Sequence, residues 1–168
     1  MKKTDFIRNC EELRSDESFN YPNDTESFVT GAHLGEIMGL TKTAVNYHIL
    51  QAGDRSSWPH AHKEEEEFIF VLEGTPQVWI DGNIFDLKYG DCVSFPNGTG
   101  HAHTIINNSD HEAKLMVIGQ IEASNDKIFY PLHVNRNKEC ESDGWFWHDH
   151  PEHALGAHDG WPDKKRPK

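Results

Sequence analysis

The 168-residue sequence contains no run of about 18 consecutive apolar residues, so we predict no membrane-spanning helix. Basic residues are also few: 16 Lys and Arg stand against 28 Asp and Glu, which gives a formal net charge of −12 at pH 7. Because this charge repels phosphate backbones and anionic lipid, we predict that neither nucleic acid nor a membrane is a partner. A small molecule is the ligand class that we expect instead.

Cysteine is scarce as well. The three cysteines, Cys10, Cys92 and Cys140, are odd in number and form no C-x-x-C motif. This usage favours a reduced, cytoplasmic location over a disulfide scaffold. Two lysines near the start (MKKTDFIRNCEEL) are followed by no apolar stretch, so we predict no secretory signal there.

The composition divides the chain into three parts, and no repeat of about 20 to 50 residues links them. Residues 1–42 are polar, and we predict an arm packed on the outside of the domain, with one helical turn near Leu34–Met38. Residues 43–122 alternate β-branched and aromatic runs with turn signals about every 8 to 12 residues, which is typical of an all-β sandwich or barrel. Residues 123–168 form a C-terminal extension rich in histidine and tryptophan.

The central part predicts a series of short strands. The clearest hairpin signal is Asp81 followed by Gly82 between two apolar runs, because a type I′ turn needs positive φ at both central positions. The predicted strands are Val45–Gln51, Glu67–Leu72, Gln77–Ile80, Asn83–Leu87, Cys92–Phe95, His101–Asn107 and Lys114–Ile121.

Twelve histidines are the unusual feature of the composition, and two H-x-H pairs make their spacing informative. His60 and His62 are two residues apart, so both imidazoles point to one side of an extended chain. Glu67 follows at the start of a strand, and two imidazoles with one carboxylate can supply three ligands of a metal site. The second pair, His101 and His103, lies beyond a Pro-Asn-Gly turn, and either member could supply the fourth ligand.

Several of these residues also have a plain structural interpretation. An H-x-H pair alone is more often a polar strand face, and only the combination with Glu67 and a second pair favours metal. His48 is either a polar group lining the barrel or a histidine satisfied by hydrogen bonds, and we favour the second. Arg55 could neutralise an anionic substrate, although an arginine in a loop is more often solvated.

The C-terminal extension contains a third H-x-H pair, His148 and His150, beside Trp145 and Trp147. A segment without strand signals rarely forms a metal site on its own. We therefore expect first that the tryptophans pack across the barrel, second that the segment is a lid, and third that it binds a separate metal ion.

The central part resembles the cupins, a family of small barrels with a double-stranded β-helix, or jelly-roll, fold. The wording around the motifs (WPHAH, EEEFIFVLEG, FPNGTGHAHT) is similar to a bacterial branch of single-domain cupins. The first family motif, G-x5-HxH-x3,4-E-x6-G, is matched at His60, His62, Glu67 and Gly74, with Gly53 one residue further from His60 than usual. The second, G-x5-PxG-x2-H-x3-N, is matched at Gly90, Pro96 and Gly98.

The position of the histidine in the second motif depends on the end from which the spacing is counted. Counting from Gly98 selects His101, whereas counting back from Asn107 selects His103. We predict His103 as the fourth ligand, because the sequence after Gly98 looks like a family branch in which the turn is two residues longer. A shift of two keeps the strand face, so His101 would also point inward, nearer the barrel mouth, as a proton carrier. Tyr47 is the other candidate for proton transfer.

The resemblance implies one divalent transition metal ion, such as Mn, Fe, Ni or Zn, held by three histidines and a glutamate. It favours a metal-dependent enzyme acting on a small, oxygen-rich metabolite, and the rival hypothesis is a metal-containing protein that binds or senses a small molecule without turnover. Barrels of this family usually pair through edge strands, so we also predict a homodimer.

Overall fold

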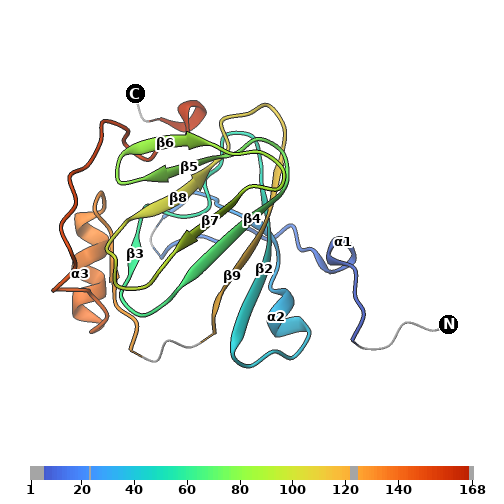
Figure 1. The fold of residues 1–168 in the computed structure, drawn as a ribbon, viewed down its shortest axis with the longest axis horizontal. Coiled ribbons are helices and arrows are strands. Elements are labelled where there is room, and N and C mark those ends of the chain that lie inside the picture. The colour runs from blue at the N-terminus through green and yellow to red at the C-terminus, as the bar shows by residue number, and fades with distance from the viewer. Residues whose placement is uncertain (1–5, 23, 122–124, 167–168) are drawn as a thin grey trace.

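The computed structural model describes residues 6–22, 24–121 and 125–166, whose strands lie in two layers (Figure 1). The first layer is a five-stranded antiparallel sheet in the order β1-β2-β9-β4-β7. Its strands are β1 (Thr30–Ala32), β2 (Thr43–Leu50), β9 (Ala113–Gln120), β4 (Glu67–Glu73) and β7 (Cys92–Phe95).

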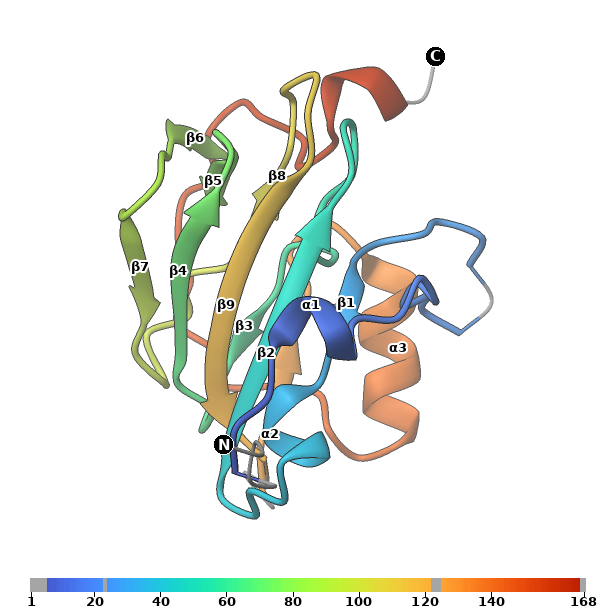
Figure 2. The same ribbon diagram turned by 90° about the vertical axis from the view of Figure 1, so that its right-hand side faces the viewer.

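The second layer is a three-stranded sheet in the order β6-β5-β8, extended by the short pair β3-β10. An isolated bridge between His60 and His103 joins the start of β3 to β8. Figure 2 shows the two layers facing each other. The strands of this layer are β6 (Asn83–Asp86), β5 (Gln77–Ile80), β8 (His103–Ile106), β3 (Ala61–His62) and β10 (Ile128–Phe129).

Helices are short and lie outside the two layers (Figure 2). They are α1 (Cys10–Leu13), α2 (Leu34–Ile37), α3 (Val134–Ser142) and a 3-10 turn at Asp163–Lys165. Among the described residues, every helix is too short or too polar to span a lipid bilayer.

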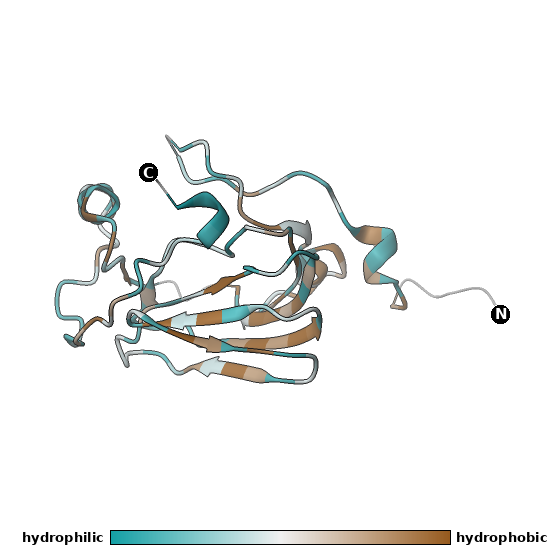
Figure 3. Ribbon diagram, turned by 90° about the horizontal axis from the view of Figure 1, so that it is seen from above, coloured by the Kyte–Doolittle hydropathy of each residue, from teal (hydrophilic) through white to brown (hydrophobic). Residues whose placement is uncertain are grey.

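The main core fills the space between the layers. Alternate residues of β4, Ile69 and Val71, are 2% and 0% exposed and meet Ile105 of β8 from the opposite layer. This alternation follows from the two-residue period of a strand, which sends every second side chain to the same face. Figure 3 shows the apolar colour concentrated on the strands and the hydrophilic colour in most connecting segments.

The strand predictions agree with the structure. Gln77–Ile80 and Cys92–Phe95 match β5 and β7, and the other predicted strands end within two residues of those observed. The helical turn near residue 34 is α2. The predicted boundary at residue 122 lies outside the described residues.

Three strands, the helices α1 and α3 and the 3-10 turn are missing from the prediction. Residues 30–32 of the predicted arm form β1, which pairs with β2 as part of the large sheet. The strands β3 and β10 are two residues each, too short to leave a period-two pattern. The helix α3 (VNRNKECES) is mostly polar, so it carries no apolar stripe for sequence analysis to detect.

Arg55 ties the two ends of the chain to the barrel. It is fully buried, although a loop arginine was expected to be solvated. Its Nε and Nη2 donate to the two carboxylate oxygens of Glu26 at 2.8 and 2.7 Å, and its Nη1 donates to the carbonyl of Gly160 at 2.8 Å. The guanidinium also lies 4.0 Å from the ring centre of Trp161. Arg55 is therefore a structural link and is not free for an anionic substrate.

The C-terminal extension packs against the outer face of the smaller layer, as expected for its tryptophans. Trp147 is 3% exposed and belongs to a cluster with Trp79, Ala102 and Ile106. The indole N–H of Trp79 donates to the carbonyl of His158 at 2.8 Å. Figure 1 shows this part of the chain, in orange and red, passing beside β5 and β6.

Candidate metal centre

The backbone brings three of the predicted ligands to one place. The N–H of His103 donates to the carbonyl of His60 at 2.9 Å, and the N–H of His60 donates back at 3.2 Å. This reciprocal pair fixes the register between the β3 segment and β8. Glu67 begins β4 in the opposite layer, so the candidate centre lies between the two layers.

The side chains converge at this point. One donor atom from each of His60, His62 and Glu67 lies within 4.8 Å of the others. Nε2 of His103 lies 2.9 Å from Oε2 of Glu67, and the rings of His60 and His103 are 5.2 Å apart between centres. Two imidazoles and one carboxylate therefore form one compact group of possible ligands, and His103 adjoins this group through its contact with Glu67.

Hydrogen bonds orient the two imidazoles of the first pair. Nδ1 of His60 donates to the carbonyl of Trp58 at 2.7 Å, and Nδ1 of His62 lies 2.5 Å from the carboxylate of Asp126. Both contacts leave Nε2 free to face the centre, which is the usual arrangement behind a metal-binding histidine. Asp126 was not identified from the sequence, because it lies outside both motifs and 64 residues from His62.

His103 is held differently. Its ring stacks on Phe95 with 3.5 Å between centres, and its Nδ1 lies 3.3 Å from the carbonyl of His101. The side chain is 3% exposed. Packing against Phe95 therefore restricts the rotation of the His103 ring.

Burial and neighbouring charge shift the pKa values of three residues of this centre. Burial lowers the pKa of His60 to about 3, so its imidazole is neutral at pH 7. Burial alone would raise the pKa of Glu67, but the contact with His103 and the nearby histidines lower it to about 2. For His62, burial is outweighed by the carboxylate of Asp126, which raises the pKa. A carboxylate facing imidazoles suits a divalent first-row ion and does not select one member of that series.

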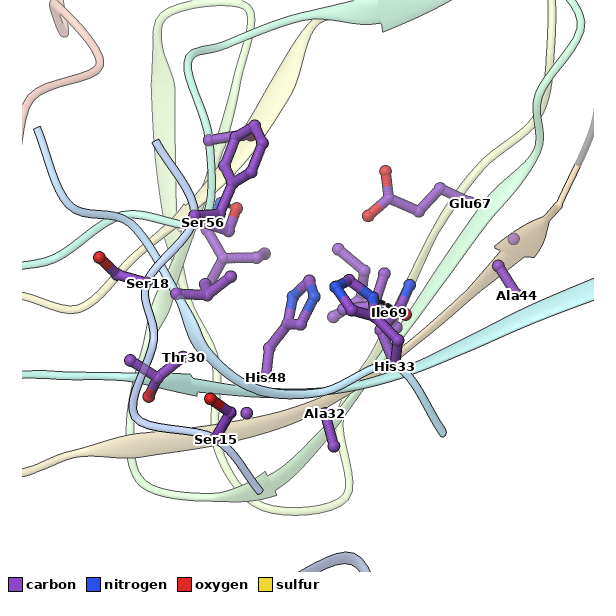
Figure 4. Close-up of a pocket in the computed structure, with 18 of the residues that line it drawn as sticks. Ser15, Ser18, Thr30, Ala32, His33, Ala44, His48, Ser56, Glu67 and Ile69 are labelled. Carbon is purple, nitrogen blue, oxygen red and sulfur yellow. Dashed lines mark hydrogen bonds between the residues drawn. The ribbon is translucent and has the colours of Figure 1, made fainter. Parts of the chain in front are cut away.

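A cavity of about 500 Å³ lies against this centre. Figure 4 shows His33, His48 and Glu67 among the residues that line it. The N-terminal arm supplies part of the wall, including Ser15 and Ser18, and no lysine or arginine is found among its described lining residues. The described lining therefore mixes polar residues with apolar ones such as Ile69 and Ile105, and offers no lysine or arginine.

His48 faces this cavity from β2. Its Nδ1 is buried and has no hydrogen-bond partner among the residues that the structure describes. Burial lowers the pKa of His48 to about 4. The favoured prediction of a satisfied histidine is therefore wrong, and the alternative of a polar group lining the barrel is correct. The neighbouring His33 is engaged, since its Nδ1 lies 2.9 Å from Oδ1 of Asn46.

The two predicted proton-transfer residues differ in position, since His101 lines a small pocket with His62, Glu67 and His103, whereas Tyr47 points away from the centre. Tyr47 alternates with His48 on β2, so it points to the outer face, where its hydroxyl donates to Glu11 at 2.5 Å. His101 precedes β8, which begins at residue 103, so strand alternation does not determine its direction. Its side chain is 48% exposed, and its Nδ1 lies 2.6 Å from Oδ2 of Asp81.

Comparison with known proteins points to one family. A family model described as "Cupin domain" matches residues 46–119. The structure of a sugar phosphate isomerase "from a cupin superfamily" of Silicibacter pomeroyi is similar with a TM-score of 0.62 and 29% identity, over 70% of this chain and 74% of that one.

Two curated relatives match shorter parts. The chain is 30% identical over 93 residues to polyketide synthase CurC of Streptomyces cyaneus, which covers 55% of this chain and 56% of that protein. It is 32% identical over 69 residues to quercetin 2,3-dioxygenase of Bacillus subtilis, which covers 40% of this chain and 20% of that protein. The chain thus spans little more than half of one relative and a fifth of the other. The jelly-roll fold predicted from the motifs is confirmed, and the protein belongs to the cupin superfamily.

Proposed function

We propose that His60, His62, Glu67 and His103 bind one divalent transition metal ion of the Mn, Fe, Ni and Zn group, and that the protein is a metal-dependent enzyme. The substrate is a small, oxygen-rich metabolite held in the adjacent cavity. The observation that carries the proposal is the grouping of His60 and His62 with the ionised carboxylate of Glu67 beside a cavity of about 500 Å³.

The protein groups have separate tasks in this proposal. The ion, when bound, polarises an oxygen atom of the substrate as a Lewis acid. Trp58 and Asp126 hold the rings of His60 and His62 in the ligating direction, and the charge of Glu67 offsets part of the charge of the ion. His48 offers an unpartnered Nδ1 to a hydroxyl or carbonyl group of the substrate.

The relatives favour a reaction on a carbohydrate-like compound. The isomerase of Silicibacter pomeroyi matches about three quarters of its own length and is named for sugar phosphates. Because no lysine or arginine lines the described part of the cavity, the metal ion would be the main positive charge available to an anionic substrate. The serine, threonine and asparagine side chains in the lining can hydrogen-bond to the hydroxyl groups of such a compound.

One observation favours the rival function, a protein that binds or senses a small molecule without turnover. Tyr47 points away from the centre, and His101, although it lies next to the centre, directs its Nδ1 to Asp81. Among the titratable residues that line the cavity, His48 has an unpartnered nitrogen in the part of the chain that the structure describes. Activity that depends on His48 would therefore distinguish the enzyme from the binding protein.

Metal analysis of the purified chain tests the proposal. We expect one ion at this centre and its loss in the double variant His60→Ala/His62→Ala, with an unchanged far-ultraviolet circular dichroism spectrum. His111→Ala, an exposed histidine outside the centre, is the matched control. A proton NMR assay with aldoses and ketoses then looks for conversion by the metal-loaded protein. Full metal content in the double variant would overturn the site, and binding without conversion would favour the rival function.

A further inference from the structure

A second group of possible ligands lies outside the centre described above. It consists of Asp81, His101 and His153, whose donor atoms all lie within 4.8 Å of one another. The three residues come from the turn between β5 and β6, the segment before β8, and the C-terminal tail. None of them belongs to the set His60, His62, Glu67 and His103, so this group is independent of the proposed function.

The geometry of the group is well defined. Nδ1 of His101 lies 2.6 Å from Oδ2 of Asp81, and the other oxygen of Asp81 accepts the backbone N–H of Ala102 at 2.9 Å. The ring of His153 stacks on that of His101 with 3.9 Å between centres and 24° between planes. A hydrogen-bonded Asp–His pair would explain the first contact, but it does not explain why a second imidazole is placed over the pair.

The backbone holds the tail in this position. The N–H of Gly156 donates to the carbonyl of Asp81 at 2.7 Å, and the N–H of His158 donates to the carbonyl of Gly82 at 3.0 Å. The approach is so close that a Cβ on Gly156 would lie 2.4 Å from the carbonyl oxygen of Gly82, so only glycine fits there. His153 therefore comes from a segment fixed to the hairpin and not from a loose end.

Further contacts fix the ligand atoms themselves. Nε2 of His153 donates to the carbonyl of Thr99 at 2.8 Å, which leaves Nδ1 as the unprotonated nitrogen. Asp81 is 7% exposed, and its φ of 47° belongs to the turn that aims its carboxylate at His101. A buried carboxylate and two imidazoles thus meet near the surface, with an open side toward solvent.

We propose that Asp81, His101 and His153 form a second metal site, which takes a divalent ion with affinity for imidazole, such as Zn²⁺, Ni²⁺ or Cu²⁺. Two nitrogen donors disfavour Ca²⁺ and Mg²⁺, which prefer oxygen. Solvent completes the coordination on the exposed side. The ion joins the tail to the β5–β6 hairpin, and it makes His101 a ligand in place of the proton carrier that the sequence suggested.

Isothermal titration calorimetry of the metal-free protein with Zn²⁺ tests the proposal. We expect two equivalents for the natural chain, one for His153→Ala and one for His60→Ala/His62→Ala. The control His148→Ala, a tail histidine with a 69% exposed side chain, should keep both. The two single-equivalent variants distinguish this site from the central one, because each loses a different ion.

A second variant guards against misfolding of the tail. Asparagine tolerates positive φ, so Asp81→Asn keeps the turn while it removes the carboxylate charge. Its affinity for the second Zn²⁺ should fall about 10- to 100-fold, with an unchanged circular dichroism spectrum. The proposal is overturned if His60→Ala/His62→Ala binds no Zn²⁺, or if His153→Ala and Asp81→Asn both bind Zn²⁺ as the natural chain does.

Discussion

At the scale of single residues, His103 is the most informative of the proposed ligands. Its Nε2 lies 2.9 Å from Oε2 of Glu67, whereas His101 turns toward Asp81. We therefore expect His103→Ala to lose the central ion and His101→Ala to keep it, as measured by metal analysis in both variants. Loss of the central ion in His101→Ala alone would show that counting from Gly98 identifies the ligand.

The residues of the centre differ in how far the sequence could predict them. His60, His62 and Glu67 follow each other within eight positions, so period-two geometry and the family motif bring them together. Asp126 was not assigned and the favoured interpretation of His48 was wrong, because their roles depend on tertiary contacts with distant parts of the chain. For His101, strand alternation was applied to a residue that precedes the strand.

Buried histidines also predict how stability depends on pH. The pKa values of His48 and His60 are lowered to about 4 and about 3, so the unfolded chain binds more protons than the folded one below pH 6.5. The metal-free protein should lose up to about 1.4 kcal/mol per pH unit for each group as the pH falls from 6.5 to 4.5. His62, with its raised pKa, opposes part of this loss.

Urea unfolding at pH 6.5, 5.5 and 4.5 measures this dependence, and His48→Gln provides the matched comparison. The variant lacks one of the two groups, so its slope should be shallower. Equal slopes of the unfolding free energy against pH in both proteins would mean that His48 takes up a proton as readily in the folded state as in the unfolded state.

At the scale of elements, the strands that the sequence predicted are those with alternating apolar residues and glycine-containing turns. The strand β1 (TGA) has too few side chains to show alternation, and it forms because Gly31 can approach β2 closely. A Cβ at Gly31 would lie 1.9 Å from the carbonyl oxygen of Tyr47. The pairing of β1 is thus a backbone property that composition does not reveal.

Substitution of this glycine tests that explanation. Gly31 has a φ of 132° and a blocked Cβ position, whereas Gly90 has a φ of 88° and nothing within 4 Å. Both alanine variants carry backbone strain of about 1 to 3 kcal/mol, but only Gly31→Ala must also displace β2. We expect its free energy of unfolding to be lower than that of Gly90→Ala by about 2 kcal/mol or more in urea titrations. Equal values would contradict the close approach.

At the scale of the whole molecule, the homodimer remains a prediction. The strands β7 and β6 each have one hydrogen-bonded neighbour and so lie at sheet edges, where pairing with a second copy can satisfy the free backbone groups. Small-angle scattering at micromolar concentration should therefore give a particle of about twice the 19.2 kDa chain mass. A monomer mass would rule the dimer out.

The connection between the two chain ends is the last property at this scale. Arg55 is fully buried and binds Glu26 of the N-terminal arm and the carbonyl of Gly160 in the tail, and the side chain of Glu26 is only 7% exposed. Arg55→Ala leaves this carboxylate buried without its partner, which should cost about 3 to 5 kcal/mol in the free energy of unfolding. Replacing both charges, as in Arg55→Met/Glu26→Met, removes the unpaired charge, so the double variant should be more stable than Arg55→Ala. Chemical denaturation of the natural chain and the two variants measures these free energies of unfolding. A double variant less stable than Arg55→Ala would mean that the loss of stability comes from the missing ion pair itself and not from the unpaired buried carboxylate.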